Sequence, residues 1–517
     1  MKAAGKKRAA HGPLGVIDVG AHSARLEISQ FGRNGERETL ENLSQPVPLG
    51  ADVFGNGRIR GNNINSVGRI LRDFSRLMAD YGVEHCKAFA TSAVREAENR
   101  DIFLDRVRLI SGIELEVLET PEEARIIFQA VCRQLERHVD ISHINAVICT
   151  VGSGATQISF VKDGHLCSAE TIRLGTLRVV EEVGVGLSSA HIREVIDPFV
   201  AAIINWVARI TPGMRPEYFI AVGSSVRALT DIAGCREPWE DVRVISRSAF
   251  RDVLLETSGV PVAELLSRYH LDDATASGLQ PCCNMLEHLF EITEAEEIFV
   301  PMINTRDAVV ADFVGEVAGR QDSFESEIIA SARYCAERYA YDGEHAEAVA
   351  RMALRLFDEL EHLHGLGERE RLLLRVAAIL HDIGMFVSNR QHHKHSFYLI
   401  RNTELPGVLP QEQSLIAVIA RYHRRALPRT SHVEYMTLLP EQRLLVSKLA
   451  AILRVADVLD RSHSEKLHIA RVTTQGDKLT IAVKGNTDLN LERRALERKA
   501  DLFEDVYGLK VVLTVTK

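Results

Sequence analysis

The 517-residue sequence has no paired-cysteine motif, no long apolar run and no excess of positive charge. Its eight cysteines are scattered, and none forms a Cys-x-x-Cys pair. We therefore expect reduced thiols rather than a disulfide framework or a zinc site. The longest apolar stretches, such as 199–207, are too short to cross a bilayer. A formal net charge of −9 argues against nucleic acid as a partner, but it leaves room for a local basic site that binds another polyanion.

The N-terminus is basic but has no apolar segment behind it. Four of the first eight residues carry positive charge, namely Lys2, Lys6, Lys7 and Arg8. Because a signal peptide requires a hydrophobic stretch after such residues, we predict a disordered tail over 1–13 and a cytoplasmic protein. Apolar residues make up 46% and charged residues 26% of the chain, which is typical of a globular protein with several domains.

Residues 14–318 alternate between apolar strands and amphipathic helices, and the pattern occurs twice. From residue 14, LGVIDVGAHSARLEISQF predicts a strand, a glycine turn and a second strand. From residue 143, HINAVICTVGSGATQISF predicts the same three elements. Helical spacing of apolar residues predicts helices over 62–81 and 189–210. The pattern indicates two α/β lobes, 14–140 and 141–318, that repeat one structural unit.

Three turns rich in glycine and serine follow predicted strands, and their backbone N–H groups could bind an anion. Asp18, in the first turn, could hold a divalent ion directly or through water. Arg95 could offer a fixed guanidinium to a phosphate. The residues that we expect to bind phosphate are Gly20, Ser23, Arg95, Gly152, Ser153, Gly154, Thr156, Gly223, Ser224 and Ser225.

The second turn, ICTVGSGATQI at 148–158, lacks the carboxylate that usually accompanies a phosphate-binding glycine turn. Thr150 enters the turn and Gln157 leaves it. Both side chains can form hydrogen bonds, but neither can neutralise a metal ion. Glu122 and Glu123 begin a helix just after Pro121. They could simply stabilise the helix dipole, or one could be a general base that orients water onto a phosphoryl group.

Beyond residue 318 the glycine turns disappear and the pattern becomes helical. Helices are predicted over 322–340, 343–364, 367–382, 393–401, 410–424 and 441–460. The last fifty residues predict strands around a helix at 489–505. We therefore expect an all-α domain over 319–465 and a small α+β domain over 466–517.

Histidines and aspartates with metal-binding character are distributed over these helices. His345, His381, Asp382 and Asp457 supply two imidazoles and two carboxylates, a set suited to Mn²⁺, Fe²⁺ or another transition ion. Two further histidines could take a second metal or a phosphate, namely His395 and His423. Any one of these histidines could instead be an ordinary core or surface residue.

A basic patch occurs in the same helical region. We expect it to bind a polyanion through charge-assisted hydrogen bonds. Its members are Lys394, Arg421, Arg424 and Arg425.

These motifs, in their order along the chain, resemble those of the exopolyphosphatase/guanosine pentaphosphatase (Ppx/GppA) phosphatases. The similar segments are IDVGAHSARLEI, ATSAVREAENRDIFL, VLETPEEARIIFQAV, VGSGATQISFVKDG and VGSSVRAL. The resemblance implies two ribonuclease-H-like lobes of the actin/sugar-kinase/Hsp70 type with a cleft between them. It also implies Mg²⁺-dependent release of the terminal phosphate of polyphosphate or guanosine pentaphosphate, and a homodimer.

Matched residue by residue, the resemblance assigns roles to three side chains. Asp18 matches the metal- and phosphate-binding aspartate of the family, Arg95 the phosphate-binding arginine, and Glu123 the base that activates water. The chain departs from the family pattern in the second turn, where Thr150, Ala155 and Gln157 replace an aspartate, a serine and a glutamate. These replacements put the metal site of the cleft in question.

The helical region resembles the C-terminal HD-type domain of long family members. The order of His345, His381-Asp382 and Asp457 has HD-domain spacing, and HHKHS and YHRRA are similar to segments of that domain. Three functions are compatible with the sequence: a phosphoanhydride hydrolase in the cleft, a metal-dependent phosphohydrolase in the HD domain that acts on a nucleotide or alarmone, and a cleft that only senses its phosphate ligand.

Overall fold

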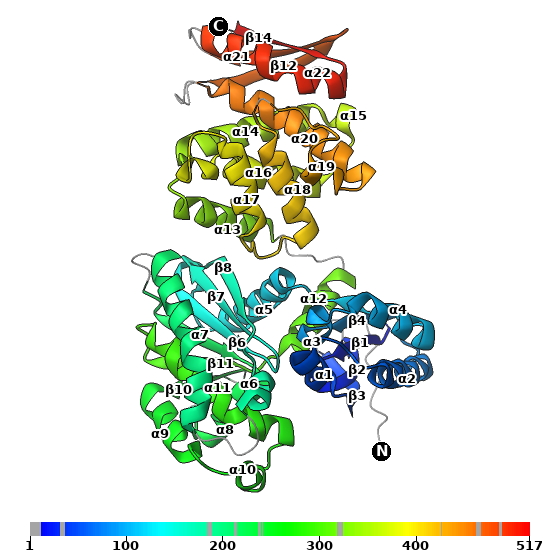
Figure 1. The fold of residues 1–517 in the computed structure, drawn as a ribbon, viewed down its shortest axis with the longest axis vertical. Coiled ribbons are helices and arrows are strands. Elements are labelled where there is room, and N and C mark those ends of the chain that lie inside the picture. Colours follow the sequence, from blue (N-terminus) through cyan, green and yellow to red (C-terminus); the bar gives the residue numbers. More distant parts are fainter. Residues whose placement is uncertain are drawn as a thin grey trace, which may run out of the picture. The chain divides into compact units, whose positions relative to one another are not determined.

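The computed structural model describes residues 12–31, 37–183, 189–210, 215–235, 239, 241–317, 324–424, 426–461, 467–484 and 489–516. The chain divides into two compact units (Figure 1). The first comprises residues 1–164 and 169–322, and the second comprises 165–168 and 323–517. The basic tail expected over 1–13 lies almost wholly outside the described residues. No helix among the described residues is long and apolar enough to span a bilayer.

The first unit begins with a five-stranded sheet in the order β3-β2-β1-β4-β5 (Figure 1). Strand β1 (Leu14–Val19) pairs antiparallel with β2 (Ser23–Phe31) and parallel with β4 (His85–Ala90). The outer strands are β3 (Arg37–Pro46) and the two-residue β5 (Glu116–Val117). Because β1 is central and mostly buried, its C-terminal end holds Asp18 at a well-defined position.

Helices cover this first sheet and supply the rest of its core. They are α1 (Leu49–Asn56), α2 (Gly61–Asp80), α3 (Ser92–Glu96) and α4 (Arg100–Ser111). The predicted helix at 62–81 is confirmed as α2, whose apolar stripe packs into the core. Burial of these apolar side chains, at roughly 25 cal/mol per Å², anchors the strand ends that carry the polar residues.

A second sheet has six strands in the order β10-β11-β9-β6-β7-β8. Its strands are β6 (Ala146–Val151), β7 (Thr156–Lys162), β8 (His165–Ile172), β9 (Tyr218–Val222), β10 (Val242–Ser246) and β11 (Glu297–Pro301). Strand β6 pairs antiparallel with β7 and parallel with β9. Because β1 pairs with β2 and β4 in the same way, the predicted structural repeat is confirmed.

The helices of this second sheet surround one buried helix, α11 (Asp273–Glu291), whose apolar residues lie in the core. The others are α6 (Thr176–Val183), α7 (Ser189–Ile210), α8 (Ser224–Ile232), α9 (Arg247–Thr257) and α10 (Val262–Tyr269). Helices α5 (Thr120–Leu135) and α12 (Thr305–Val317) pack against each other. A short 3-10 helix, η1 (Ile141–His143), precedes β6. The N-termini of α8 and α12 follow β9 and β11 directly, so helix ends and strand ends meet at one edge of the sheet.

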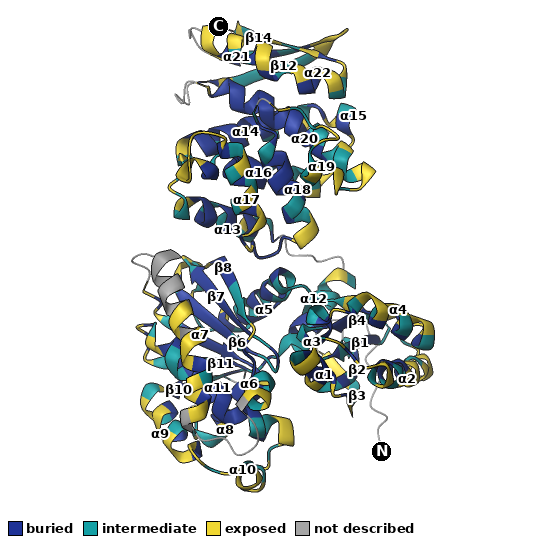
Figure 2. Ribbon diagram, viewed as in Figure 1, coloured by how far each residue is buried: buried dark blue, intermediate teal, exposed yellow. Residues whose placement is uncertain are grey.

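The second unit is helical. Its helices are α13 (Glu325–Arg338), α14 (Gly343–Glu359), α15 (Glu361–His364), α16 (Glu368–Leu380), α17 (His392–Arg401), α18 (Pro410–Arg421), α19 (Val433–Met436) and α20 (Pro440–Leu459), with a 3-10 turn η2 (Ile383–Phe386). Six of these match the predicted helices within a few residues. Residues 449–459 of α20 are buried throughout (Figure 2), so α20 is the central helix of this unit.

The last described residues of the chain form a small module of strands and helices. Strands β12 (His468–Gln475), β13 (Lys478–Lys484) and β14 (Lys510–Thr516) form a sheet in that order. Helices α21 (Asn490–Lys499) and α22 (Asp501–Tyr507) connect β13 to β14 and pack against α20. This packing brings residues near position 500 to the central helix.

Candidate active site and metal-ligand groups

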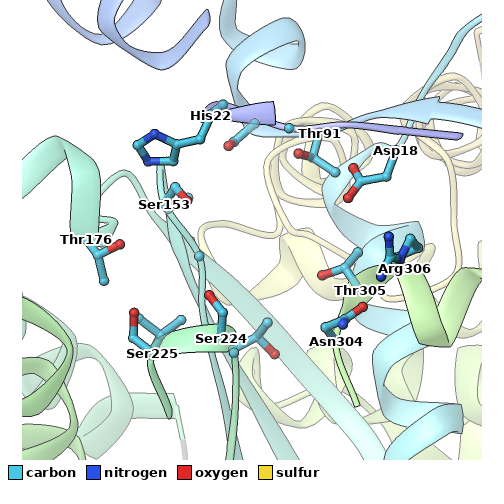
Figure 3. Close-up of a pocket in the computed structure, with 18 of the residues that line it drawn as sticks. Asp18, His22, Thr91, Ser153, Thr176, Ser224, Ser225, Asn304, Thr305 and Arg306 are labelled. Carbon is cyan, nitrogen blue, oxygen red and sulfur yellow. The ribbon is translucent and has the colours of Figure 1, made fainter. Parts of the chain in front are cut away.

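A pocket of about 220 Å³ opens in the first unit where the ends of β1, β4, β6, β9 and β11 converge. Ligands of α/β proteins commonly bind at the carboxyl ends of such strands. Figure 3 shows that polar side chains from both sheets surround it, with Asp18, Thr91 and Arg306 near one another and Ser153, Thr176 and Ser225 farther along the wall. Both repeated lobes therefore contribute to one polar site.

Asp18 presents a carboxylate to this pocket. It is half-buried and has no hydrogen-bond or ion-pair partner among the residues that the structure describes. Burial raises the pKa of Asp18 to about 6, and the nearby Arg25 and Arg306 guanidinium groups only partly offset this effect. A desolvated carboxylate of this kind is well suited to bind a cation.

The first two glycine turns contain the same kind of backbone hydrogen bond. This bond changes the role that we expected for Gly20 and Gly152. The N–H of Gly20 donates to the carbonyl of Ser23 at 2.9 Å, and the N–H of Gly152 donates to that of Ala155 at 3.0 Å. Both glycines line the pocket, but these N–H groups close the turns and do not point at a ligand. Gly20 and Gly152 therefore shape the site, and Ser23 and Ser153 also line it.

Two residues expected to bind phosphate do not line the pocket. Thr156 is fully buried, and its hydroxyl donates to the carbonyl of Leu174 at 2.7 Å. Gly154 packs against the first lobe, since a Cβ atom there would lie 2.3 Å from Cζ of Phe54. The alternation of side chains along β7 turns Thr156 toward the core, whereas Gln157 faces the pocket.

The third turn lies where it was expected. Gly223 adopts φ of 146°, and a Cβ atom at this position would lie 2.5 Å from the carbonyl oxygen of Val151. Only glycine allows the strand ends to approach this closely. Ser224 and Ser225 then begin α8 and line the pocket, where the N-terminal end of the helix favours an anion.

Arg95 and Glu123 form an ion pair on the pocket wall. Nη1 of Arg95 lies 3.0 Å from Oε2 of Glu123 and also donates to the carbonyl of Leu118. The pairing fixes both side chains, which are mostly buried. The neighbouring Glu122 pairs instead with Arg125 at 2.6 Å and is not part of the pocket lining. Of the two glutamates at the start of α5, Glu123 is therefore the one placed to act on a ligand.

The sequence did not predict several residues that line the pocket. Arg25, Arg227 and Arg306 line the pocket beside Arg95 and make it more basic than expected. A helix-capping pattern in the sequence could have indicated the position of Arg306. At the start of α12, Asn304 accepts from the N–H of Asp307 at 2.9 Å, and Asp307 accepts from the N–H of Asn304 at 3.1 Å. Such a cap holds the intervening side chains at the pocket edge, and Thr305 and Arg306 both line it.

The neutral replacements at the second turn also line the pocket. Nε2 of Gln157 donates to the carbonyl of Thr120 at 3.1 Å, at the start of α5. Its Oε1 is buried and accepts no hydrogen bond from the described residues. Thr150 lies opposite it, near the end of β6. The second turn thus offers the pocket oxygen atoms without adding negative charge.

The second unit brings histidine and aspartate ligand atoms together in two groups. His345, His381 and Asp457 form one group. The other group contains Asp382, His392 and His423. Within each group the ligand atoms all lie within 4.8 Å of one another. Buried sets of imidazole and carboxylate of this kind suit a transition metal ion.

The protonation states differ between the two histidines of the first group. Burial lowers the pKa of His381 to about 4, so its ring is neutral at physiological pH. Burial also disfavours the charge on His345. The carboxylate of Asp457, 3.6 Å from Nε2, and that of Asp460, which accepts from Nδ1, outweigh this effect and raise the pKa of the histidine to about 9. Lys499 contacts Asp457 and, despite burial, holds the pKa of this carboxyl well below its usual range.

The geometry replaces one of the expected histidines. Neither group contains His395, and among the described residues it is His392 that lies with Asp382 and His423. Helix α17 buries His392, Ser396 and Ile400 at four-residue spacing, so His395 falls on its half-exposed flank. The HHKH segment contains three histidines, and the rotational phase of the helix determines which of them faces Asp382.

The structure describes three members of the expected basic patch, Lys394, Arg421 and Arg424. Arg421 forms an ion pair with Glu434 and stacks over the ring of Phe397. Lys394 is exposed and Arg424 is half-buried. Arg425 lies outside the described residues.

Comparison with known proteins places these features in a family. The family model "Ppx/GppA phosphatase family" matches residues 32–187, and "Ppx/GppA phosphatase, domain III" matches residues 329–505. A guanosine-5'-triphosphate,3'-diphosphate pyrophosphatase of Vibrio vulnificus is 23% identical over 493 residues, covering 92% of this chain and 93% of the relative. The protein of that name from Photobacterium profundum is 25% identical over 460 residues, covering 87% and 88%.

Solved structures support the fold. The Ppx/GppA family member of Aquifex aeolicus aligns with a TM-score of 0.50 at 21% identity, covering 60% of this chain and 99% of its own. An exopolyphosphatase from Cytophaga hutchinsonii aligns with a TM-score of 0.52 at 18% identity, with the same coverage. Both show the actin-like fold that the resemblance implied. One family model matches residues 32–187 and the other matches residues 329–505. The chain therefore belongs to the Ppx/GppA phosphatase family, a family of hydrolases.

Proposed function

We propose that the pocket of the first unit hydrolyses the terminal phosphate of guanosine pentaphosphate or of inorganic polyphosphate. One observation carries this proposal: Arg25, Arg95, Arg227 and Arg306 line the same pocket as the carboxylates Asp18 and Glu123. Guanidinium groups suit a chain of phosphates, and the carboxylates suit a metal ion and a water molecule. The names of the curated relatives favour guanosine pentaphosphate as the first substrate to test.

The residues of the pocket fit a magnesium ion, although they include few acids. Asp18 offers an accessible carboxylate that no described residue pairs, and magnesium commonly binds through one or two carboxylates together with phosphate oxygens. Thr150 and Gln157 could add neutral oxygen ligands or contacts to metal-bound water. When bound, the ion would neutralise charge on the phosphate oxygens.

The remaining chemistry belongs to side chains of this protein. The arginines would hold the phosphate chain, and Ser224 and Ser225 would bind it at the N-terminus of α8. Glu123, held by Arg95, would orient the attacking water and take its proton. Catalysis of phosphoryl transfer depends mainly on such positioning and charge stabilisation.

Replacement of Glu123 by glutamine tests this function. We expect Glu123→Gln to lower kcat for phosphate release by at least about a hundredfold, while the matched Glu122→Gln variant, whose side chain lies outside the pocket, keeps nearly the wild-type rate. Phosphate release is measured with guanosine pentaphosphate and with polyphosphate, each with and without Mg²⁺. An unchanged rate in Glu123→Gln would rule out this assignment. Ligand binding by wild type without any release would favour a sensor.

We also propose that the helical region of the second unit is an HD-type domain. It would hold Mn²⁺, Fe²⁺ or another transition ion through His345, His381, Asp382 and Asp457, and would provide a second phosphohydrolase activity toward a nucleotide or alarmone. The observation that favours this second function is that His345, His381 and Asp457 converge in one buried group, while Asp382 lies in a second group with His392 and His423. A homodimer and a cytoplasmic location, both expected from the sequence, stay predictions.

A further inference from the structure

We infer that Glu27 of β2 and Asn42 of β3 are positioning residues, which hold the guanidinium of Arg306 in place for a phosphate ligand. The inference rests on the proposed role of the pocket in the first unit, because Arg306 lines that pocket. Glu27 and Asn42 do not line it. They therefore act on a ligand only through Arg306.

Strand pairing places Glu27 beside the pocket. Leu26 and Ile28 are fully buried in the core. Because side chains alternate along a strand, Arg25 and Glu27 lie together on the opposite face of the sheet. Arg25 lines the pocket, so Glu27 is one step farther along β2 from it. Glu27 and Asn42 are direct partners in the pairing of β2 with β3.

The two carboxylate oxygens of Glu27 face different partners. Oε1 accepts from the hydroxyl of Ser29 and from Nε of Arg37, the latter at 3.0 Å. Oε2 lies 3.7 Å from Nε of Arg306. Burial alone would raise the pKa of Glu27, but the hydrogen bonds from Arg37 and Ser29 outweigh it and lower this pKa below its ordinary value. Glu27 is thus an ionised, anchored carboxylate with one oxygen directed at Arg306.

The donors of Arg306 are divided between the sheet and the pocket. Nη1 donates to Oδ1 of Asn42 at 3.3 Å. Nε is buried and has no hydrogen-bond partner among the described residues, so the charge of Glu27 compensates its burial. Nη2 makes no hydrogen bond with the described residues and remains available to a ligand. Figure 3 shows the side chain of Arg306 next to Asp18 in the pocket.

Arg37 extends the same support to the start of α12. Besides contacting Glu27, its Nη1 and Nη2 atoms lie 3.4 Å from Oδ1 of Asp307. Asp307 is the next residue after Arg306. Glu27 is therefore connected to the guanidinium of Arg306 directly and, through Arg37, to the helix end that carries it. An arginine held in this way loses less conformational freedom when it binds a phosphate.

Removal of the Glu27 charge has two opposite effects on phosphate binding. It makes the surroundings of the pocket more positive, which favours an anion. This effect should be small, because Arg37 already neutralises Glu27 at contact distance. It also frees Arg306 to turn toward Asp18, the carboxylate beside it in the pocket. We expect the second effect to dominate, so that binding weakens.

Calorimetric titration with tripolyphosphate in EDTA tests the inference without turnover. We expect Glu27→Gln to raise Kd about fivefold, while Glu38→Gln, an exposed glutamate of β3, leaves it unchanged. In an Arg306→Met background, Glu27→Gln should have no further effect. An equal loss in both backgrounds would show a merely structural role and overturn the inference. Unchanged or tighter binding by Glu27→Gln, or no binding by the wild type, would also overturn it.

Asn42→Ala provides a second test that does not depend on the folding of Glu27→Gln. Asn42 is exposed, so its truncation should leave the fold intact. We expect Kd to rise about twofold in the wild-type background and not at all with Arg306→Met. The same Kd rise in both backgrounds, or none in the wild type, would contradict the support of Arg306 by β3.

Phosphate release separates this inference from the proposed hydrolase. If guanosine pentaphosphate is hydrolysed, Glu27→Gln should raise KM about fivefold and change kcat by less than about twofold, because uniform binding is lost. Binding effects that depend on Arg306, without any release, would support the inference and contradict the hydrolase. Release with an unchanged KM in Glu27→Gln would support the hydrolase and contradict the inference.

Discussion

Asp18 combines a buried environment with an accessible carboxylate, and this combination has a cost for stability. Burial raises its pKa to about 6 from an ordinary value of 3.8. A carboxyl whose folded-state pKa is raised stabilises the fold at low pH, and that contribution is lost as pH rises through about 6. Above this pH the Asp18 carboxylate is charged in both states, but only in the folded, metal-free protein is that charge shielded from water.

We therefore predict that Asp18→Asn stabilises the metal-free protein at pH 8. The pKa shift corresponds to at most about 3 kcal/mol, and solvent in the pocket should reduce the gain to about 1 kcal/mol. Thermal unfolding in EDTA should show a higher Tm for the variant at pH 8 and a smaller difference at pH 5. In Mg²⁺ the order should reverse, because only the wild type gains from binding the ion. A lower Tm of the variant in EDTA at pH 8 would contradict this account.

The neutral second turn leads to a different prediction at the residue scale. Thr150 and Gln157 line the pocket at positions where the family pattern has acids. We predict that Thr150→Asp with Gln157→Glu raises the affinity for Mg²⁺ about tenfold, because two carboxylates are added to the ion's surroundings. Phosphate release titrated with Mg²⁺ measures this change, and Thr150→Asn with Gln157 retained is the neutral control. An unchanged magnesium dependence would show that Asp18 and Glu123 suffice.

At the scale of elements, the sequence predicted the repeated strand–turn–strand units and most helices, because periodicity and turn residues are local signals. It did not predict how the turns use their N–H groups. Gly20 and Gly152 donate within the turn, which depends on backbone torsion angles rather than on composition. The sequence also did not predict the rotational phase of α17. The helix begins at His392, and this start decides which histidine of HHKH faces Asp382.

The start of α17 is set by a close contact with η2. A Cβ atom on Gly384 would lie 2.2 Å from the carbonyl oxygen of His392 and 2.4 Å from the N atom of Ser396. The Gly384 N–H also donates to the hydroxyl of Ser396 at 2.9 Å. Gly384 thus brings Asp382 and His392 to ligand distance by allowing the two backbones to touch.

We predict that Gly384→Ala destabilises the protein by about 1 to 3 kcal/mol, because backbone atoms must move to admit the methyl group. It should also weaken Mn²⁺ binding in the second unit. The control is Gly367→Ala, where a Cβ atom would approach no closer than 3.4 Å, to the end of a flexible glutamate. Thermal unfolding and Mn²⁺ titration provide the two readouts. Equal behaviour of the two alanine variants would show that the contact does not position His392.

At the scale of the whole molecule, the second unit depends on one buried arginine. Arg454 of α20 is fully buried. Its Nε donates to the carbonyl of Lys499 at 2.9 Å, and Nη2 donates to Asp501 at 2.6 Å. Its Nη1 donates to carbonyls of the loop that follows His423, including that of Ala426 at 3.3 Å. Arg454 therefore connects the central helix, a ligand loop and the C-terminal module.

Because these carbonyls and the Asp501 carboxylate lose their donor together, we predict that Arg454→Met destabilises the second unit by about 3 to 5 kcal/mol. The chain forms two compact units, so calorimetry should show a lower transition temperature for one of two transitions and little change in the other. The control is Arg493→Met, an exposed arginine of α21, which should leave both transitions in place. Equal shifts of both transitions would indicate that the units unfold together. Loss of Mn²⁺ binding in Arg454→Met at temperatures below its transition would further show that this arginine holds the ligand loop in position.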